Sequence, residues 1–229
     1  MAKRRKSKKQ VQDETLIDIV EVKESAESYF EQNKNIVLGL IAVLVIILGG
    51  YLFYKFGIQG PKEQNAETAM YRAEQQFARD SFALALENPG GGFEGFLDII
   101  DNYSGTDAAN LANYYAGVSY LNLGRFEAAI EYLNDFSPAG NVTPAMKNGA
   151  LGDAYSELGE FDNALSAYKK AADSKNEFLS PYYLKKYGLL SEKQGDKEAA
   201  LEAFQKIKKD YYDSSEALDI DKYIARVQS

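Results

Sequence analysis

The residue types that most often carry chemistry in proteins are scarce in this sequence. Its 229 residues include no Cys and no His, which removes thiolate chemistry, disulfides, the commonest general base and the commonest metal ligand. Asp98 and Asp101 are three residues apart and would share one face of a helix, but no acid or base accompanies them there. We therefore expect no catalytic site, no metal site and no cofactor, and we predict that the protein is not an enzyme.

Two further groups of residues resemble functional motifs without completing them. The glycines at 90–92 lack the preceding strand and the following Lys of a phosphate-binding loop, so we interpret them as a flexible linker. Lys206, Lys208 and Lys209 form a short basic run, which we interpret as the solvated face of a helix. Neither group indicates a ligand.

Charge is distributed unevenly along the chain, whose formal net charge is −8. Residues 1–35 hold eight Lys and Arg against seven Asp and Glu, whereas residues 36–229 hold 18 against 27. The larger part is therefore acidic. Because nucleic-acid binding usually needs a basic face, we expect no DNA partner.

The basic residues concentrate in a tail over 1–12, which we predict to be disordered. By charge alone this tail could contact anionic lipid or the ribosome through Lys3, Arg4, Arg5 and Lys6. A tail that only sets membrane topology is an equally good interpretation.

The next segment, 13–35, has apolar residues at helical spacing and predicts an imperfect amphipathic juxtamembrane helix. That helix either packs on a partner protein or extends the following segment.

An apolar run without any charge extends from Ile36 to Tyr54. As a helix these residues would span roughly 29 Å, which is about the hydrocarbon thickness of a bilayer. A buried core helix rarely stays apolar on every face for this length, and no cleavage site of a signal peptide follows. We predict an uncleaved transmembrane helix over 36–56 that contacts lipid. The basic tail favours a cytoplasmic N-terminus, with the acidic domain on the opposite side of the membrane. A cytoplasmic C-terminal domain is the alternative.

The remaining residues, 57–229, contain an internal repeat. Three segments align on a glycine that is followed by a helix: LGRFEAAIEYL from Leu123, LGEFDNALSAY from Leu158 and QGDKEAALEAF from Gln194. These glycines lie 35 and 36 residues apart, close to the period of about 34 residues that is typical of tetratricopeptide repeats (TPR). A second set of small residues would let the two helices of each hairpin approach closely: Gly117, Gly152 and Gly188.

This period predicts three TPR hairpins, over 108–141, 144–177 and 180–212. Thr143-Pro144 and Ser180-Pro181 would start the second and third hairpins, each as an N-cap followed by a Pro at the first helical position. Ser191 replaces an aromatic residue of the pattern, so we expect weaker packing in the third repeat.

The flanking segments predict a degenerate hairpin over 65–104 and a capping helix over 214–228, because the open end of a repeat stack needs a cover. The predicted fold is all-α: one transmembrane helix plus a right-handed α-solenoid of the TPR type.

Together these features resemble the ancillary Sec-translocon subunit family of bacterial inner-membrane TPR proteins. The similarity lies in the phrase ESAESYFEQNKNIVLGLIAV (Glu24 to Val43), in the degenerate first hairpin and in the terminal phrase LDIDKYIARVQS (Leu218 to Ser229). The resemblance implies a single-pass protein of the bacterial inner membrane with a cytoplasmic N-terminus and a periplasmic TPR domain. It also implies association with Sec translocon subunits and periplasmic chaperones. The alternative is a TPR scaffold for another envelope complex, in cell division or outer-membrane assembly.

TPR stacks bind protein partners on the concave face that the first helix of each hairpin lines. Capture of a C-terminal carboxylate is disfavoured here, because Gly149 and Asp153 stand where basic residues would be needed. For any single residue on this face, plain surface or packing is the alternative to binding. The predicted partner-binding positions are Tyr114, Val118, Leu121, Asn122, Asp153, Tyr182, Lys185 and Leu189.

Overall fold

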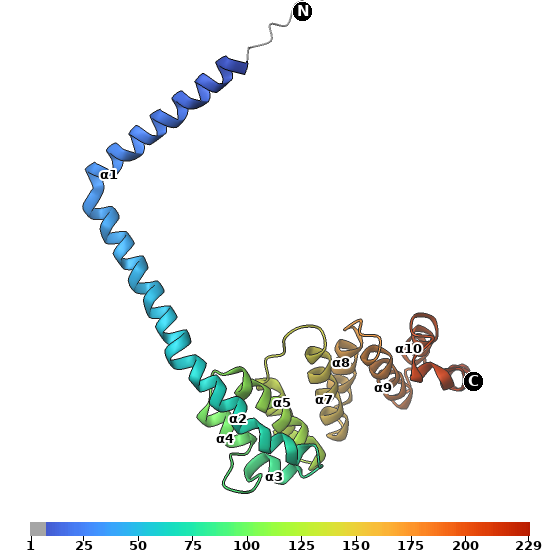
Figure 1. Cartoon of the computed structure of the whole chain (residues 1–229). Coiled ribbons are helices and arrows are strands. Elements are labelled where there is room, and N and C mark those ends of the chain that lie inside the picture. Colours follow the sequence, from blue (N-terminus) through green and yellow to red (C-terminus); the bar gives the residue numbers. More distant parts are fainter. Residues whose placement is uncertain (1–7) are drawn as a thin grey trace, which may run out of the picture. The chain divides into compact units, whose positions relative to one another are not determined.

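The computed structural model describes residues 8–229, and it describes their side chains from residue 28 onward (Figure 1). The predicted contact residues Lys3, Arg4, Arg5 and Lys6 lie outside this range. Every regular element between residues 8 and 229 is helical. In chain order these are α1 (Lys8–Phe53), the π-helical η1 (Tyr54–Gln59), α2 (Gly60–Phe77), α3 (Phe82–Glu87), α4 (Phe96–Asn102), α5 (Asp107–Asn122), α6 (Phe126–Asp135), α7 (Thr143–Glu157), α8 (Phe161–Ala172), α9 (Leu179–Lys193), α10 (Lys197–Asp210), the 3₁₀ turn η2 (Ser215–Asp219) and α11 (Ile220–Gln228).

The chain divides into two compact units, Met1–Gly60 and Pro61–Ser229. In the first unit α1 begins at Lys8, so the prediction of a disordered tail over 1–12 is wrong for residues 8–12. Lys and Gln, which dominate these positions, are good helix formers.

A kink interrupts α1 at Asn33, whose backbone angles are φ −116° and ψ 21°. The Asn33 carboxamide donates a hydrogen bond to the Tyr29 carbonyl at 3.0 Å. That carbonyl would otherwise accept from a backbone N–H one helical turn on, so the side chain competes with the helix and bends it. The kink falls just before the predicted start of the apolar segment.

The apolar run that follows the kink is helical, and nearly all of its side chains are exposed. In the described part of the chain, one helical stretch, Ser28–Phe77, is long and apolar enough to cross a membrane. Its most apolar window has a mean hydropathy of 2.9, and none of that window is buried. At the end of the run the helix widens into η1, where the Tyr54 hydroxyl donates to the Gln59 carboxamide at 3.2 Å.

The second unit starts with three helices, α2, α3 and α4, where the sequence predicts one degenerate hairpin over 65–104. A turn at Asp80, which has a φ of 56°, separates α2 from α3. Asp tolerates this left-handed conformation better than most residues, and the hydrophobic spacing alone does not reveal such a break. The Glu63 carboxylate accepts from the backbone N–H groups of Asp107 and Ala108, both at 2.8 Å, and so caps the start of α5.

Three helical hairpins then stack in sequence order: α5 with α6, α7 with α8, and α9 with α10 (Figure 1). The predicted close approach of paired helices is confirmed, because a Cβ built on any of three glycines would collide with a side chain of the facing helix. The pairs and Cβ distances are Gly117 and Leu133 Cγ (2.6 Å), Gly152 and Tyr168 Cδ1 (2.5 Å), and Gly188 and Phe204 Cε1 (2.5 Å).

The starts of the second and third hairpins differ from the prediction. Thr143 is the first residue of α7, and its hydroxyl donates to a carbonyl of the preceding loop at 2.6 Å. Ser180 is fully buried inside α9. The start of α9 is capped instead by the Asn176 carboxamide oxygen, which accepts from the N–H groups of Phe178 and Leu179 at 3.0 Å each. Asn caps a helix as well as Ser does, so residue type alone does not separate Asn176 from Ser180.

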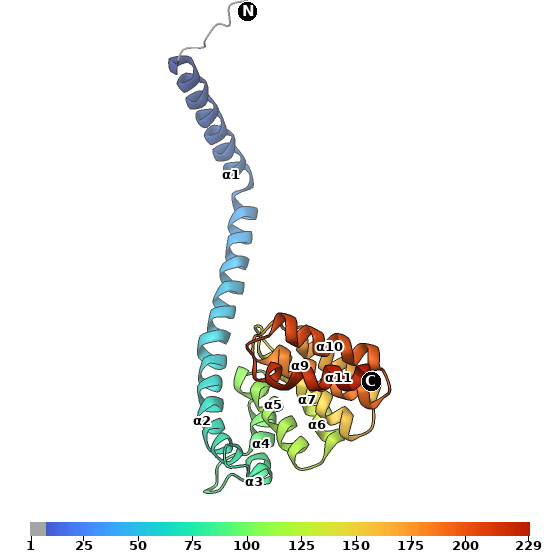
Figure 2. The same cartoon turned by 90° about the vertical axis from the view of Figure 1, so that its right-hand side faces the viewer.

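The end of the stack is closed by η2 and α11 rather than by the single helix predicted over 214–228. Ile220 and Val227 on α11 are buried, and Figure 2 shows α11 against the last hairpin.

In the third hairpin the Ser191 side chain is buried, and its hydroxyl has no hydrogen-bond partner. An unsatisfied buried hydroxyl is unfavourable, and the weaker packing of the third repeat stays a prediction.

Candidate functional site

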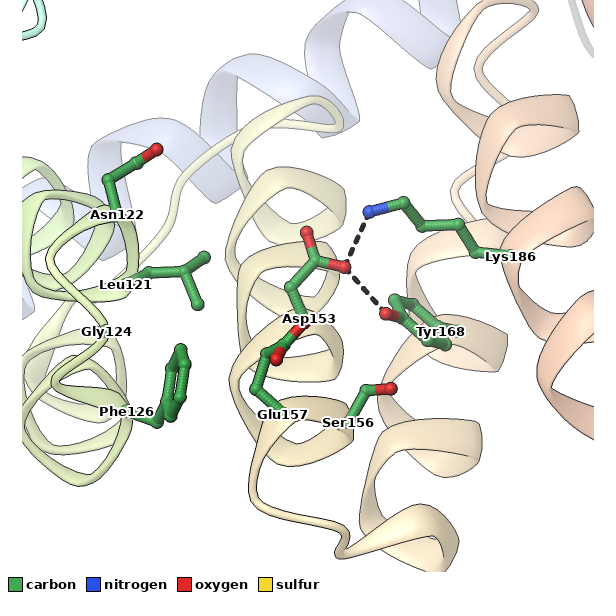
Figure 3. A pocket seen from close by; sticks show the side chains of 9 residues that line it. All are labelled: Leu121, Asn122, Gly124, Phe126, Asp153, Ser156, Glu157, Tyr168 and Lys186. Carbon is green, nitrogen blue, oxygen red and sulfur yellow. Dashed lines mark hydrogen bonds and ion pairs between the residues drawn. The ribbon is translucent and has the colours of Figure 1, made fainter.

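All eight predicted partner-binding residues lie on the first helices of the hairpins, α5, α7 and α9. The structure brings three of them, Leu121, Asn122 and Asp153, to a single cleft of about 600 Å³ (Figure 3). We call this the repeat cleft. Its other lining residues are Gly124, Phe126, Ser156, Glu157, Tyr168 and Lys186.

Two predicted residues pack between hairpins instead of facing outward. Tyr114 and Val118 on α5 are half-buried against the side chains of the next hairpin. The Tyr114 ring lies 5.4 Å from the Phe136 ring, measured between centroids. Burial, with smaller contributions from Tyr115 and Asp153, raises the pKa of the Tyr114 hydroxyl. Both residues therefore contribute to stacking of the repeats.

Lys185 is occupied by the end of the stack. Its ammonium group donates to one oxygen of Asp219 at 2.8 Å, and Lys222 binds the other oxygen at 2.5 Å. Hydrogen bonds from Lys185 and then Lys222 lower the pKa of Asp219 to about 2. Lys185 thus helps to hold η2 against α9. The remaining predicted residues, Tyr182 and Leu189, are exposed on α9.

The centre of the repeat cleft is a compact group of three polar side chains. One oxygen of Asp153 accepts from the Tyr168 hydroxyl and from the Lys186 ammonium group, each at 2.6 Å. Burial and then the hydrogen bond to Asp153 raise the pKa of Tyr168 above its ordinary range. Burial opposes the charge of Lys186, but the hydrogen bond and charge of Asp153, together with smaller contributions from Tyr182, outweigh it and raise the pKa of Lys186. The group is therefore internally neutralised.

The rim of the repeat cleft is chemically different from its centre. Asn122 and Glu157 are exposed, and Glu157 makes no ion pair with any side chain that the structure describes. Leu121 and Phe126 supply apolar surface beside them. Hydrogen bonds and apolar contact suit a polypeptide ligand. A Tyr with a raised pKa is a poor base near neutral pH, and no group of three acidic ligands for a metal occurs among the described residues.

Tyr168 and Lys186 are missing from the sequence prediction. Tyr168 lies on the second helix of its hairpin and reaches the cleft only because Gly152 leaves space for its ring. Lys186 is 33 residues from Asp153, which is about one repeat. An acidic and a basic residue separated by one repeat are therefore the sequence feature that could have predicted this ion pair. The predicted positions on α9 included the neighbouring Lys185 instead, which binds Asp219 at the end of the stack.

Comparison with known protein families identifies the type of the repeats. Residues 111–137 and residues 150–214 each match a family described as tetratricopeptide repeat. The repeats are of the TPR type. The predicted all-α fold with a TPR-type right-handed solenoid is therefore confirmed. A solved structure described as "Crystal structure of MamA protein" is 18% identical with a TM-score of 0.49, covering 71% of this chain and 91% of that chain. The search of curated proteins found no match.

Proposed function

We propose that this chain is a membrane-anchored module that binds a protein partner through the repeat cleft. TPR domains are protein–protein interaction modules, which gives the class of ligand. The observation that carries the proposal is the convergence of three first helices on one cleft. Residues of α5, α7 and α9 line it, and its rim offers the exposed side chains of Asn122 and Glu157, of which Glu157 makes no ion pair with any described side chain.

The anchor in this proposal is the apolar stretch within α1, which is long and apolar enough to cross a membrane. The basic N-terminal tail favours a cytoplasmic N-terminus, which would put the acidic TPR domain in the periplasm of a bacterial inner membrane. Reporters fused after Ser229, one active only in the cytoplasm and one only in the periplasm, test this orientation. Activity of the cytoplasmic reporter alone would overturn it.

The partner we propose is the Sec translocon, with the chain as an accessory subunit that assists export or hands emerging proteins to periplasmic chaperones. This rests on the similarity of the segment Glu24 to Val43 and of the terminal helix to the ancillary translocon subunits. The test is capture of the full chain in mild detergent, followed by mass spectrometry. Failure to recover any translocon or chaperone subunit would count against this partner, and recovery of cell-division or outer-membrane-assembly proteins would favour a scaffold instead.

A matched pair of variants connects the partner to the repeat cleft. Glu157→Lys reverses a charge on the cleft rim, whereas Glu127→Lys makes the same change at an exposed position of α6. We expect Glu157→Lys to lose most of the captured partner and Glu127→Lys to retain it, because complementary charge determines partner choice at interfaces. Equal capture by the two variants would show that the repeat cleft is not the binding site.

A further inference from the structure

A second cleft, which we call the end cleft, lies where α9 begins and where the chain leaves α10. Its volume is about 620 Å³. Two stretches far apart in sequence line it, one at the start of α9 and one in the loop that leads into η2. The lining residues are Glu177, Phe178, Leu179, Tyr182, Asp213, Ser214, Ser215 and Glu216.

Aromatic side chains stand open to solvent at this cleft. Phe178 is 83% exposed and Tyr182 is 43% exposed. The backbone of Phe178 is held at the start of α9, since the Asn176 side chain accepts a hydrogen bond from its N–H at 3.0 Å. A single exposed aromatic residue needs no explanation, but two exposed aromatic residues that line the same cleft are typical of an interaction surface.

The charge of the end cleft is entirely negative. Glu177, Asp213 and Glu216 line it, and no Lys or Arg does. None of these carboxylates forms an ion pair within the described residues, and Glu216 accepts only from the neighbouring Ser215 hydroxyl, at 3.0 Å.

Nearby acids behave differently. Asp221 is paired with Lys208 at 2.7 Å, and Asp219 is paired with Lys185 at 2.8 Å. Basic side chains are therefore available at this end of the stack, yet they pair with acids outside the cleft. The cleft presents unneutralised negative charge around apolar surface, which is complementary to a positively charged, partly apolar ligand.

We propose that the end cleft docks a cationic polypeptide segment of a partner, with one apolar side chain inserted between Phe178 and Tyr182. Lys or Arg residues on either side of that side chain would meet the three carboxylates. An anionic lipid surface is repelled by the same carboxylates. One residue of each cleft is in contact on α9, because the Lys186 ammonium group of the repeat cleft lies 5.1 Å from the centre of the Tyr182 ring of the end cleft. This inference rests on the proposed function in one respect, namely that the domain binds protein.

The test uses the full chain in nanodiscs of zwitterionic phosphatidylcholine, so that the bilayer does not attract a cationic probe. The probe is a short fluorescent peptide in which a central Phe lies between two pairs of Lys, and binding is followed by fluorescence anisotropy. Two comparison peptides carry Glu in place of Lys, or Ala in place of Phe. Empty nanodiscs provide the blank.

Each variant of the end cleft has a matched control. Phe178→Ala is compared with Val142→Ala, which removes an exposed apolar side chain from the corresponding loop of the preceding repeat. Glu177→Gln with Asp213→Asn is compared with Glu127→Gln and Glu131→Gln on α6, which remove the same amount of charge from exposed positions.

We expect saturable binding of the Phe/Lys peptide that weakens about tenfold in Phe178→Ala and in the Glu177/Asp213 variant, with both controls unchanged. Binding should also fall as salt rises, since exposed charges are screened. Unchanged affinity in Phe178→Ala, or equal binding of the Glu peptide, would overturn the proposal. Tighter binding after removal of residues 1–9 would identify the chain's own basic tail as the occupant and would overturn it too.

The two proposals can fail separately. If the end-cleft variants bind the peptide as wild type does while Glu157→Lys still loses its captured partner, only the end-cleft inference is wrong. If peptide binding depends on Phe178 while Glu157→Lys captures its partner normally, the repeat cleft is wrong as the binding site and the end cleft stands.

Discussion

The repeat cleft and the end cleft are formed by the same stack of hairpins, yet they hold their charges in opposite ways. At the repeat cleft Asp153 is neutralised by Lys186 and bound by Tyr168, both at 2.6 Å. At the end cleft three carboxylates have no cationic partner among the described side chains. The difference indicates that the charge of Asp153 stabilises the packing of the repeat-cleft helices, whereas the charges of the end-cleft carboxylates remain available to a ligand. Substitution of Asp153 at the centre of the repeat cleft should therefore change stability, whereas substitution of the end-cleft carboxylates should change binding with little change in stability.

The largest effect is expected at Gly149, where α7 packs against Tyr183 of α9. A Cβ at this position would overlap the Tyr183 ring, so Gly149→Val should lower the free energy of unfolding by about 3 kcal/mol, as overpacking of a filled core does. Urea unfolding followed by far-UV circular dichroism measures it. Tyr183→Ala in the same chain should restore part of the loss, and a fully stable single variant would contradict the close packing of Gly149 against Tyr183.

A smaller loss is expected from removing the centre of the repeat cleft. Asp153→Ala leaves the Tyr168 hydroxyl and the Lys186 ammonium group without their shared acceptor, which should cost about 2 kcal/mol because both donors are partly buried. Asp162→Ala, at an exposed position of α8, is the control and should stay within about 0.5 kcal/mol of wild type. Similar unfolding curves for the two variants would mean that the Asp153 group contributes nothing to stability.

The same group predicts a loss of stability at alkaline pH. The folded protein raises the pKa of Tyr168, so this contribution is complete below the unfolded value of about 10 and is lost as the pH rises above it. Tyr168→Phe should cost about 1 kcal/mol at neutral pH. Above pH 10 the wild type should lose up to about 1.4 kcal/mol per pH unit more than this variant does. Parallel profiles of wild type and variant would refute the prediction, and Tyr212→Phe controls for loss of an exposed phenol.

The smallest change in stability is expected at the end cleft. Phe178 is 83% exposed, so Phe178→Ala should alter the free energy of unfolding by less than about 0.5 kcal/mol. If the same variant also weakens peptide binding about tenfold, the contrast between the clefts holds. A large loss of stability would instead show that Phe178 contributes to the packing of the third repeat, and the contrast between the two clefts would no longer hold.

Much of the fold follows from local and periodic features of the sequence. The glycines at 117, 152 and 188 recur with the repeat because each must leave room for one side chain of the facing helix. The start of the third hairpin shows the limit of such reasoning. Ser180 and Asn176 are both suitable caps by residue type, and the fold uses Asn176 while it buries Ser180. The break at Asp80 is equally invisible in the hydrophobic spacing, because a single left-handed residue changes the direction of the chain without changing its pattern.

The sequence by itself determined the repeat period, the helical hairpins and the apolar stretch from Ile36 to Tyr54, since all three depend on residues close together or equally spaced along the chain. The tertiary structure decided which charged residues meet. Lys185 and Lys186 are adjacent in sequence, but one is bound by Asp219 and the other by Asp153. The carboxylates of the end cleft come from two stretches more than 30 residues apart. Ion pairing depends on distances of a few ångströms between side chains remote in sequence, and a period of 35 or 36 residues does not specify those distances.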